Sequence, residues 1–133
     1  MELPNGYTHI ALDKVGSTNT EAARFIDEGA ASNRTVITAK EQGEGRGRGN
    51  RTWSSPPGNL YATLCLIPER AENEWPHLCF VLSLAIAEGL KNILSNKSQV
   101  HVKWPNDVLV GGRKIGGILL ETHHTKTDQK VML

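Results

Sequence analysis

Residues 35–49 decide the fold, and they read TVITAKEQGEGRGRG. The opening residues are rich in β-branched side chains, which predicts a strand over Thr35–Glu41. Gly43–Gly49 then holds four glycines and two arginines, so its backbone can adopt positive φ and expose bare N–H groups. Arginine forks match carboxylate or phosphate oxygens. The pattern predicts a strand followed by a loop that binds an anionic small molecule.

Two other interpretations of this loop stay open: a disordered surface loop, and a Gly-Arg segment that binds nucleic acid. Gly-Arg tracts usually repeat within basic, low-complexity surroundings, whereas this segment is single and lies between two expected strands. The net charge is +1, from 15 Lys and Arg against 14 Asp and Glu, which gives little reason to expect a nucleic-acid binder. A ligand loop is favoured, and we expect residues 43–50 to be mobile without ligand and ordered with it.

On the N-terminal side of the loop we expect a strand over Tyr7–Val15 and then a helix. Thr18 and Glu21 have the spacing of a capping box, and Gly29 would end the helix. The apolar stripe of this helix would consist of Ala22, Phe25 and Ile26.

On the C-terminal side, turn residues and apolar periodicity separate further elements. They are a strand over Asn59–Ile67, a helix over Pro76–Leu94, a strand over Val100–Trp104, and a hairpin of Val108–Val110 and Arg113–Glu121 about Gly111-Gly112. The middle of the second helix is apolar on nearly every side, so we expect it to pack between layers. This order predicts an α+β fold, a mixed β-sheet with helices packed on one face.

Length and composition suit one domain spanning residues 1–133, with 38% hydrophobic residues for a core. Cys65 and Cys79 lie in apolar runs without metal or redox spacing, which indicates reduced core residues of a cytoplasmic protein. The N-terminus lacks the basic and apolar regions of a signal peptide, and the most apolar run, 78–87, is too short to span a bilayer. The five histidines show no metal spacing, so no metal site is predicted.

Several polar groups allow a structural as well as a functional interpretation. Ser17-Thr18-Asn19 is compatible with a helix cap and with ligand binding, because a helix N-terminus offers free N–H groups. Asn106-Asp107 suits a turn, and Lys103 and Lys114 suit solvated positions. Gly116-Gly117 inside an apolar strand indicates close backbone approach.

Taken together, several blocks closely resemble biotin protein ligases, and both their order and their spacing match over residues 17–121. The blocks are Ser17-Thr18-Asn19, Gln42, Gly45-Arg46-Gly47-Arg48 with Trp53, Pro57–Tyr61, Lys103–Asp107 and Arg113–Glu121. The resemblance implies the catalytic domain of that family without an N-terminal winged helix. It also implies truncation before the family's C-terminal strands and small β-domain, with Val131–Leu133 as the start of a further strand.

The resemblance implies a ligase reaction in two steps. Biotin and ATP, with Mg²⁺, would give biotinyl-5'-adenylate and pyrophosphate. A lysine of a biotin carboxyl-carrier protein would then attack the adenylate. It implies neither DNA nor membrane as a partner, and it leaves a homo-oligomer open. The alternatives are an inactive fragment that binds biotin or the adenylate, and an acyl-adenylate transferase that resembles lipoate ligases.

The resemblance also implies roles for individual residues. Those for biotin are Ser17, Thr18, Asn19, Gln42, Arg46, Gly47, Arg48, Lys114 and Gly117. Those for ATP are Arg46, Arg48, Trp53, Lys103, Asn106 and Lys114. The catalytic residues would be Lys114, Arg48 and Asp107, because adenylation joins two anions and needs cations that offset their repulsion. Asp107 could assist deprotonation of the acceptor lysine.

Overall fold

The computed structural model describes residues 3–133, apart from the side chains of Asn50 and Ser98. It divides into two compact units. The first contains the described residues up to Pro68 together with Glu121–Leu133, and the second is Glu69–Leu120.

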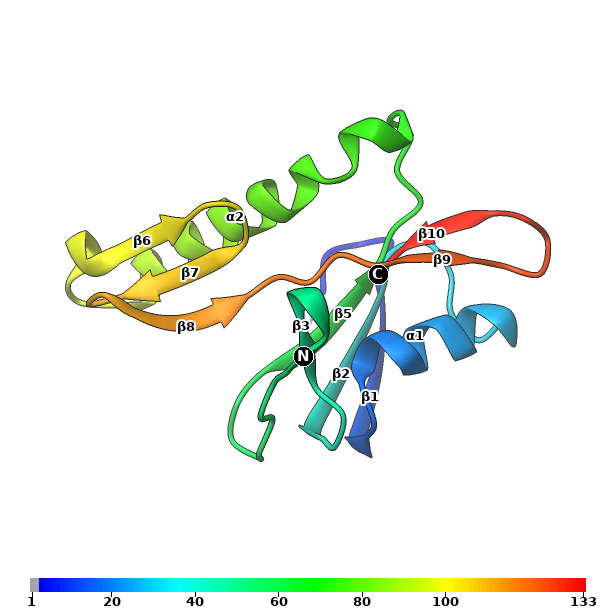
Figure 1. Cartoon of the computed structure of the whole chain (residues 1–133), viewed down its shortest axis with the longest axis horizontal. Helices are drawn as coiled ribbons and strands as arrows, with labels where there is room; N and C mark the ends of the chain where they lie inside the picture. The colour runs from blue at the N-terminus through cyan, green and yellow to red at the C-terminus, as the bar shows by residue number, and fades with distance from the viewer. Residues whose placement is uncertain (1–2) are drawn as a thin grey trace. The chain divides into compact units, whose positions relative to one another are not determined.

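The first unit is built on a mixed three-stranded sheet (Figure 1). Its strands are β1 (Thr8–Val15), β2 (Thr35–Gln42) and β5 (Tyr61–Cys65), in the order β1-β2-β5. β1 and β2 are parallel, while β2 and β5 are antiparallel. Since parallel neighbours need a crossover connection, helix α1 (Thr18–Asp27) joins β1 to β2 and packs against β2 and β5.

The core of this unit lies between α1 and the sheet. Ala22 is fully buried with Ile37 and Cys65, while Phe25 and Ile26 pack against them, so the predicted apolar stripe of the helix is confirmed. Burial raises the pKa of the Cys65 thiol to about 11, which makes it an inert core residue.

The predicted capping box is wrong. Ser17 is the N-cap of α1, and its side chain makes no capping hydrogen bond to any residue that the structure describes. Instead, Oε1 of Gln42, at the end of β2, accepts a hydrogen bond from the backbone N–H of Thr18 at 2.8 Å. A side chain of β2 therefore provides the hydrogen-bond acceptor for a backbone N–H in the first turn of the helix.

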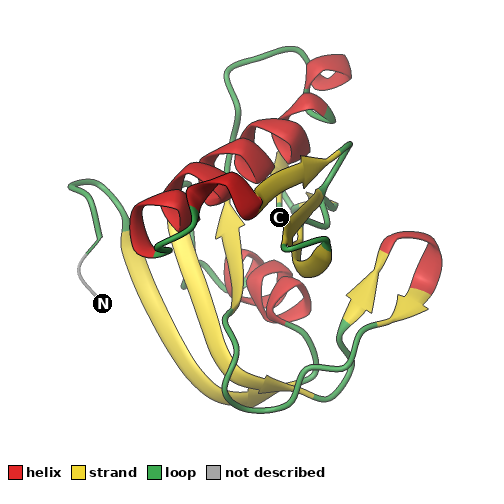
Figure 2. Cartoon of the chain, turned by 90° about the vertical axis from the view of Figure 1, so that its left-hand side faces the viewer, coloured by secondary structure: helices red, strands yellow, loops and turns green. Residues whose placement is uncertain are grey.

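The glycine-arginine segment forms a small ribbon rather than a loop without structure. β3 (Arg46–Gly47) pairs antiparallel with β4 (Arg51–Thr52), and the one-turn helix η1 (Arg48–Asn50) closes the ribbon at its tip. Figure 2 shows this ribbon at its right-hand side, with η1 in red. Gly49 has φ of 67°, which suits its place in this tight turn.

The last part of the chain returns to the first unit as a hairpin of β9 (Thr122–His124) and β10 (Lys130–Met132). Val131 and Met132 are buried, and Met132 also forms a bridge to Leu66 beyond the end of β5. The predicted strand at Val131–Leu133 is thus confirmed as β10.

The second unit consists of one long helix on an antiparallel sheet. The elements are η2 (Glu72–Glu74), α2 (His77–Ile93), η3 (Lys97–Gln99), β6 (Val100–Lys103), β7 (Asp107–Val110) and β8 (Arg113–Gly117). Ala87 of α2 packs on Val100 and Val108 in the core. Gly111 and Gly112 have φ of 58° and 76°, so the predicted glycine turn is confirmed. The strand after it ends at Gly117 rather than Glu121, and the chain enters the first unit at Glu121.

Helix α2 departs from its predicted place between two layers. It packs against β6 and β7, while Val81, Ile86 and Ile93 on its other sides are more than 40% exposed. Cys79 in this helix is half-buried rather than a core residue. Across residues 3–133, no helix combines the length and apolarity that a membrane crossing requires.

The α+β class is confirmed, but the described strands form four sheets instead of one. Consecutive strands joined by short turns pair with one another, so β6, β7 and β8 close into a sheet of their own. Among these sheets, β1-β2-β5 is the mixed one, and each helix covers the sheet of its own unit.

Ile37→Ala is expected to lower the free energy of unfolding by about 2–5 kcal/mol, since it opens a cavity in the core of the first unit. Ile37 is fully buried, whereas Leu60 is 77% exposed in the same unit. Urea denaturation of Ile37→Ala beside Leu60→Ala checks this, and the control should stay within about 0.5 kcal/mol of the parent chain. Equal losses in the two variants would contradict this description of the core.

Candidate functional site

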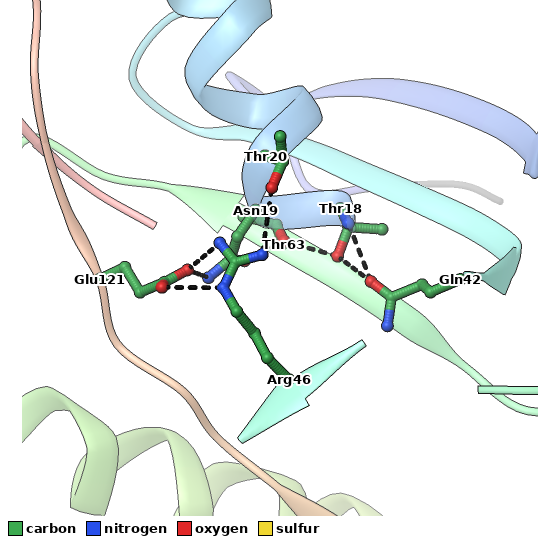
Figure 3. A network of polar contacts seen from close by, with 7 residues as sticks. All are labelled: Thr18, Asn19, Thr20, Gln42, Arg46, Thr63 and Glu121. Atoms are coloured by element: carbon green, nitrogen blue, oxygen red, sulfur yellow. Dashed lines mark hydrogen bonds and ion pairs between the residues drawn. The ribbon is translucent and has the colours of Figure 1, made fainter. Parts of the chain in front are cut away.

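A connected set of polar side chains surrounds the N-terminus of α1 in the first unit (Figure 3). We call it the polar network, and its members are Thr18, Asn19, Thr20, Gln42, Arg46, Thr63 and Glu121. They come from α1, β2, β3, β5 and the segment that enters β9. The fold thus brings Asn19 into hydrogen-bond contact with Glu121, 102 positions away in the sequence.

Gln42 anchors one end of the polar network. Its Oε1 accepts hydrogen bonds from the backbone N–H of Thr18 at 2.8 Å and from the Thr18 hydroxyl at 3.0 Å. Its Nε2 donates to Oγ of the buried Ser55 at 3.1 Å. Because a backbone N–H can only donate, these contacts fix which way the Gln42 amide points.

Thr63 and Asn19 continue the polar network toward a carboxylate. The Thr63 hydroxyl lies 2.8 Å from Oγ1 of Thr18 and also contacts Oδ1 of Asn19. Nδ2 of Asn19 donates to Oε2 of Glu121 at 2.7 Å. Since the single Thr63 hydrogen can serve only one oxygen at a time, these two contacts are alternative hydrogen bonds.

Arg46 and Glu121 form the charged end of the polar network. Nε of Arg46 donates to Oε1 of Glu121 at 3.0 Å, and Nη2 donates to Oε2 at 2.7 Å. Nη1 of Arg46 donates to the hydroxyl of Thr20 at 3.1 Å. Both side chains of the ion pair are 33% exposed, so solvent weakens this bidentate pair only in part.

The pKa of Glu121 reflects its place in the polar network. Burial raises the pKa, but hydrogen bonds from Arg46 and Asn19, together with the Arg46 charge, outweigh burial and hold it below its ordinary value of 4.5. Glu121 is therefore an ionised acceptor at neutral pH.

Glu121→Gln is expected to lower the free energy of unfolding more at pH 7 than at about pH 3. The folded-state pKa is depressed, so the stabilisation is complete above the unfolded-state pKa and is lost as pH falls through the folded value. Chemical denaturation of both chains across this range measures the difference. Glu28→Gln, at an exposed carboxylate of the C-cap residue of α1, is the matched control. A gap between parent and Glu121→Gln that does not change with pH would contradict a role for the charge.

Gly45 allows the glycine-arginine segment to lie close against its neighbours. A Cβ at this buried residue would stand 2.5 Å from both Oγ of Ser55 and the carbonyl oxygen of Trp53. The Trp53 N–H also donates to the Gly45 carbonyl at 2.8 Å. The segment is therefore held by backbone contacts that leave no room for a side chain.

The other residues predicted for the first unit flank the polar network. Ser17 is buried at the start of α1 and Gly47 lies in β3. Arg48 is exposed in η1 at the tip of the ribbon, and Trp53 is 38% exposed just after β4.

The second unit brings together a smaller group of predicted residues on β7 and β8. Nζ of Lys114 lies 2.6 Å from Oδ1 of Asp107, and the two side chains are 35% and 22% exposed. A Cβ at Gly117 would come within 3.1 Å of Nζ of Lys114, so this glycine makes room for the ion pair. Asn106 donates from Nδ2 to the Ile118 carbonyl at 2.8 Å. Lys103 is exposed opposite Asp107 in the β6–β7 register.

No role was predicted for Glu121, because its partners come from distant parts of the chain. A single carboxylate after the apolar run Ile118-Leu119-Leu120 is the signal that could have singled it out. Thr63 and Ser55 gave no such signal, since isolated hydroxyl residues are common in strands and turns.

A hollow of about 250 Å³ lies beside the charged end of the polar network. It is lined by Asn19, Thr20, Ala23, Arg46, Glu121, Thr122, His123 and Leu133. Within residues 3–133, no three His, Cys, Asp or Glu side chains are placed to hold a metal ion.

Comparison with known proteins gives the chain its family. The model of the biotin/lipoate A/B protein ligase family matches residues 12–133. The chain is 39% identical over 111 residues to the biotin–[acetyl-CoA-carboxylase] ligase of Paracoccus denitrificans, covering 84% of the chain and 45% of that relative.

Solved structures agree with this match. The biotin protein ligase of Aquifex aeolicus, in complex with biotin and ATP, is 32% identical with a TM-score of 0.76, over 94% of this chain and 49% of that one. The biotin protein ligase of Leishmania major, in complex with biotinyl-5-AMP, is 30% identical with a TM-score of 0.75, over 98% of this chain and 56% of that one. The chain therefore spans about half the length of these relatives, and it belongs to the biotin/lipoate A/B protein ligase family.

Proposed function

We propose that this chain takes part in the activation of biotin with ATP and the transfer of biotin to a lysine of a carboxyl-carrier protein. One observation carries the proposal: Thr18, Asn19, Gln42 and Arg46, which the sequence assigns to biotin, join in one polar network at the N-terminus of α1. Family relatives have been solved with biotin and ATP or with biotinyl-5-AMP, which supports the same ligands here.

The polar network suits the ureido ring of biotin. That ring is neutral, and it presents two N–H donors and one carbonyl acceptor. Thr18, Asn19 and Gln42 supply hydroxyl and amide groups whose orientation the polar network already fixes. Recognition by groups of fixed orientation gives specificity because a ligand without matching donors and acceptors forms fewer hydrogen bonds with them.

The polar network also favours biotin over lipoate. The dithiolane ring of lipoate has no N–H or carbonyl group, so it could form no such hydrogen bonds with the polar groups of Thr18, Asn19 and Gln42. Ser17 at the N-cap is also a polar neighbour rather than an apolar wall.

In the first step, a biotin carboxylate oxygen attacks the α-phosphorus of ATP. An acyl–phosphate bond forms, the bond to pyrophosphate breaks, and pyrophosphate leaves with the electron pair. We assign Lys114 the role of stabilising the negative charge on the biotin carboxylate and the α-phosphate, with Arg48 as a second cation. The Asp107 carboxylate orients Lys114 through the contact at 2.6 Å.

In the second step, the neutral amine of the acceptor lysine attacks the acyl carbon, and AMP leaves. Asp107 is the carboxylate that we assign to receive a proton from that amine. We assign contacts with the nucleotide to Trp53, Lys103 and Asn106. We assign close backbone approach to biotin to Gly47 and Gly117.

Mg²⁺ enters the proposal with ATP as part of the substrate. The free thiols Cys65 and Cys79 suit a reducing compartment, which supports a cytoplasmic reaction.

Isothermal titration with biotin, followed by ATP and Mg²⁺, tests the proposal on this chain. Heat on biotin addition and pyrophosphate release on ATP addition are expected. Binding of biotin without pyrophosphate would favour the alternative of a binding module without turnover. Absence of both signals, with a folded protein shown by its thermal transition, would contradict the proposed function.

A further inference from the structure

We propose that Glu121 is a positioning residue, and that Arg46 acts by binding Glu121 rather than as a ligand of the phosphates. The inference rests on the proposed binding of biotin by the polar network. It changes the role of Arg46 that the sequence suggested, and it gives a role to Glu121, which the sequence left without one.

The side chain of Arg46 is already committed within the first unit. Three of its N–H groups reach protein oxygens, at 3.0 and 2.7 Å on Glu121 and at 3.1 Å on Thr20. The planar fork of arginine fits a carboxylate with two parallel bonds, which is the geometry observed. A phosphate would have to displace this half-buried carboxylate, so Arg46 is poorly suited to clamp ATP.

Arg48 differs from Arg46 in position. It lies in η1 at the exposed tip of the ribbon, directly after β3. The geometry therefore divides the two arginines, with Arg46 holding the base of the ribbon and Arg48 reaching the anionic substrate.

Glu121 holds more than one segment. Its Oε2 accepts from Asn19 of α1 at 2.7 Å, while both of its oxygens accept from Arg46 of β3. One carboxylate thus joins the biotin-binding end of the helix to the base of the ribbon, and it fixes the Asn19 amide so that Oδ1 faces Thr63. Loss of Glu121 would leave the donors of Asn19 and Arg46 without their acceptor.

Glu121→Gln is the sharpest variant, because it keeps the size of the side chain but replaces one acceptor oxygen by a donor NH₂. Glu121→Asp keeps the charge and should restore part of the function. Glu28→Gln is the matched control, since Glu28 is the exposed C-cap residue of α1 and accepts two hydrogen bonds from Arg24, at 2.9 and 2.8 Å.

A first measurement needs no ligand. Trypsin cleavage after Arg46 and Arg48 in the whole chain should be about tenfold faster in Glu121→Gln, because the ribbon opens locally more often. Glu28→Gln should be cleaved at the parental rate. Equal cleavage of Glu121→Gln and the parent chain would overturn the proposal, whether or not biotin binds.

A second measurement separates the two roles of Arg46. We expect Glu121→Gln and Arg46→Ala each to raise the Kd for biotin by about tenfold. The Kd of the double variant should not exceed the higher of the two single-variant values. The Kd for ATP should stay unchanged in all three, and Glu121→Asp should recover part of the biotin affinity. A Kd for ATP that rises in Arg46→Ala but not in Glu121→Gln would overturn the proposal. Failure of the parent chain to bind biotin would instead refute the proposed function, and the cleavage result would still decide the role of Glu121.

Discussion

Lys114→Ala is expected to lower the rate of pyrophosphate release by on the order of ten- to hundredfold. A hydrogen bond to a charged group contributes about 1.5–3 kcal/mol, and each 1.4 kcal/mol changes a rate by about tenfold. Lys114 is the cation that Asp107 holds in place on β8, at 2.6 Å. The variant removes that charge from the step in which two anions must meet, and steady-state release of pyrophosphate from ATP and biotin measures the loss.

The fold should survive this change, because Lys114 is one-third exposed and lies outside the core of the second unit. Lys91→Ala is the control, since Lys91 also pairs with a carboxylate, Glu88, at 2.7 Å in the same unit. The control should keep the parental rate and melting temperature. Full pyrophosphate release by Lys114→Ala would remove this lysine from its proposed role.

Gly45→Ala is expected to destabilise the first unit by about 1–3 kcal/mol, the usual cost of forcing a methyl group into a packed site. The new Cβ would stand 2.5 Å from Oγ of Ser55 and 2.5 Å from the carbonyl oxygen of Trp53. Oγ of Ser55 accepts a hydrogen bond from the Gln42 amide, so a shift of Ser55 that relieves this clash would also move Gln42 in the polar network. Biotin affinity should therefore fall by roughly tenfold or more.

Gly43→Ala provides the comparison from the same segment. Its Cβ would meet only the Val15 carbonyl, at 3.8 Å, which is an ordinary contact. We expect this variant to melt and to bind biotin like the parent chain, in a thermal scan and a biotin titration run beside Gly45→Ala. If the two alanine variants behaved alike, close packing at Gly45 would not be what holds the segment.

Local patterns were enough to predict most elements of this fold. The β-branched run at Thr35–Glu41 and the glycine turn at Gly111-Gly112 depend on neighbouring residues alone, and both predictions are confirmed. The cap of α1 could not be predicted in this way. Its acceptor is Gln42, which lies 24 residues away on β2, so local spacing suggested a capping box that does not form.

The candidate site shows the same division between local and distant information. The blocks that resemble biotin protein ligases named Thr18, Asn19, Gln42 and Arg46, and the structure joins all four. Glu121 lies at the end of one of these blocks but received no role, because its importance comes from contacts 75 and 102 residues away in the sequence. The partners of a buried polar group are set by tertiary packing, which a pattern along the chain does not contain.

The most direct test of the account is whether this chain forms biotinyl-5'-adenylate. Biotin, ATP and Mg²⁺ are incubated with the parent chain and with Lys114→Ala, and the adenylate and pyrophosphate are quantified by mass spectrometry and a coupled assay. The account predicts equal amounts of the two products with the parent chain, and on the order of ten- to hundredfold less of both with the variant. Biotin-independent release of pyrophosphate, or absence of adenylate from a folded chain that binds both substrates, would contradict it.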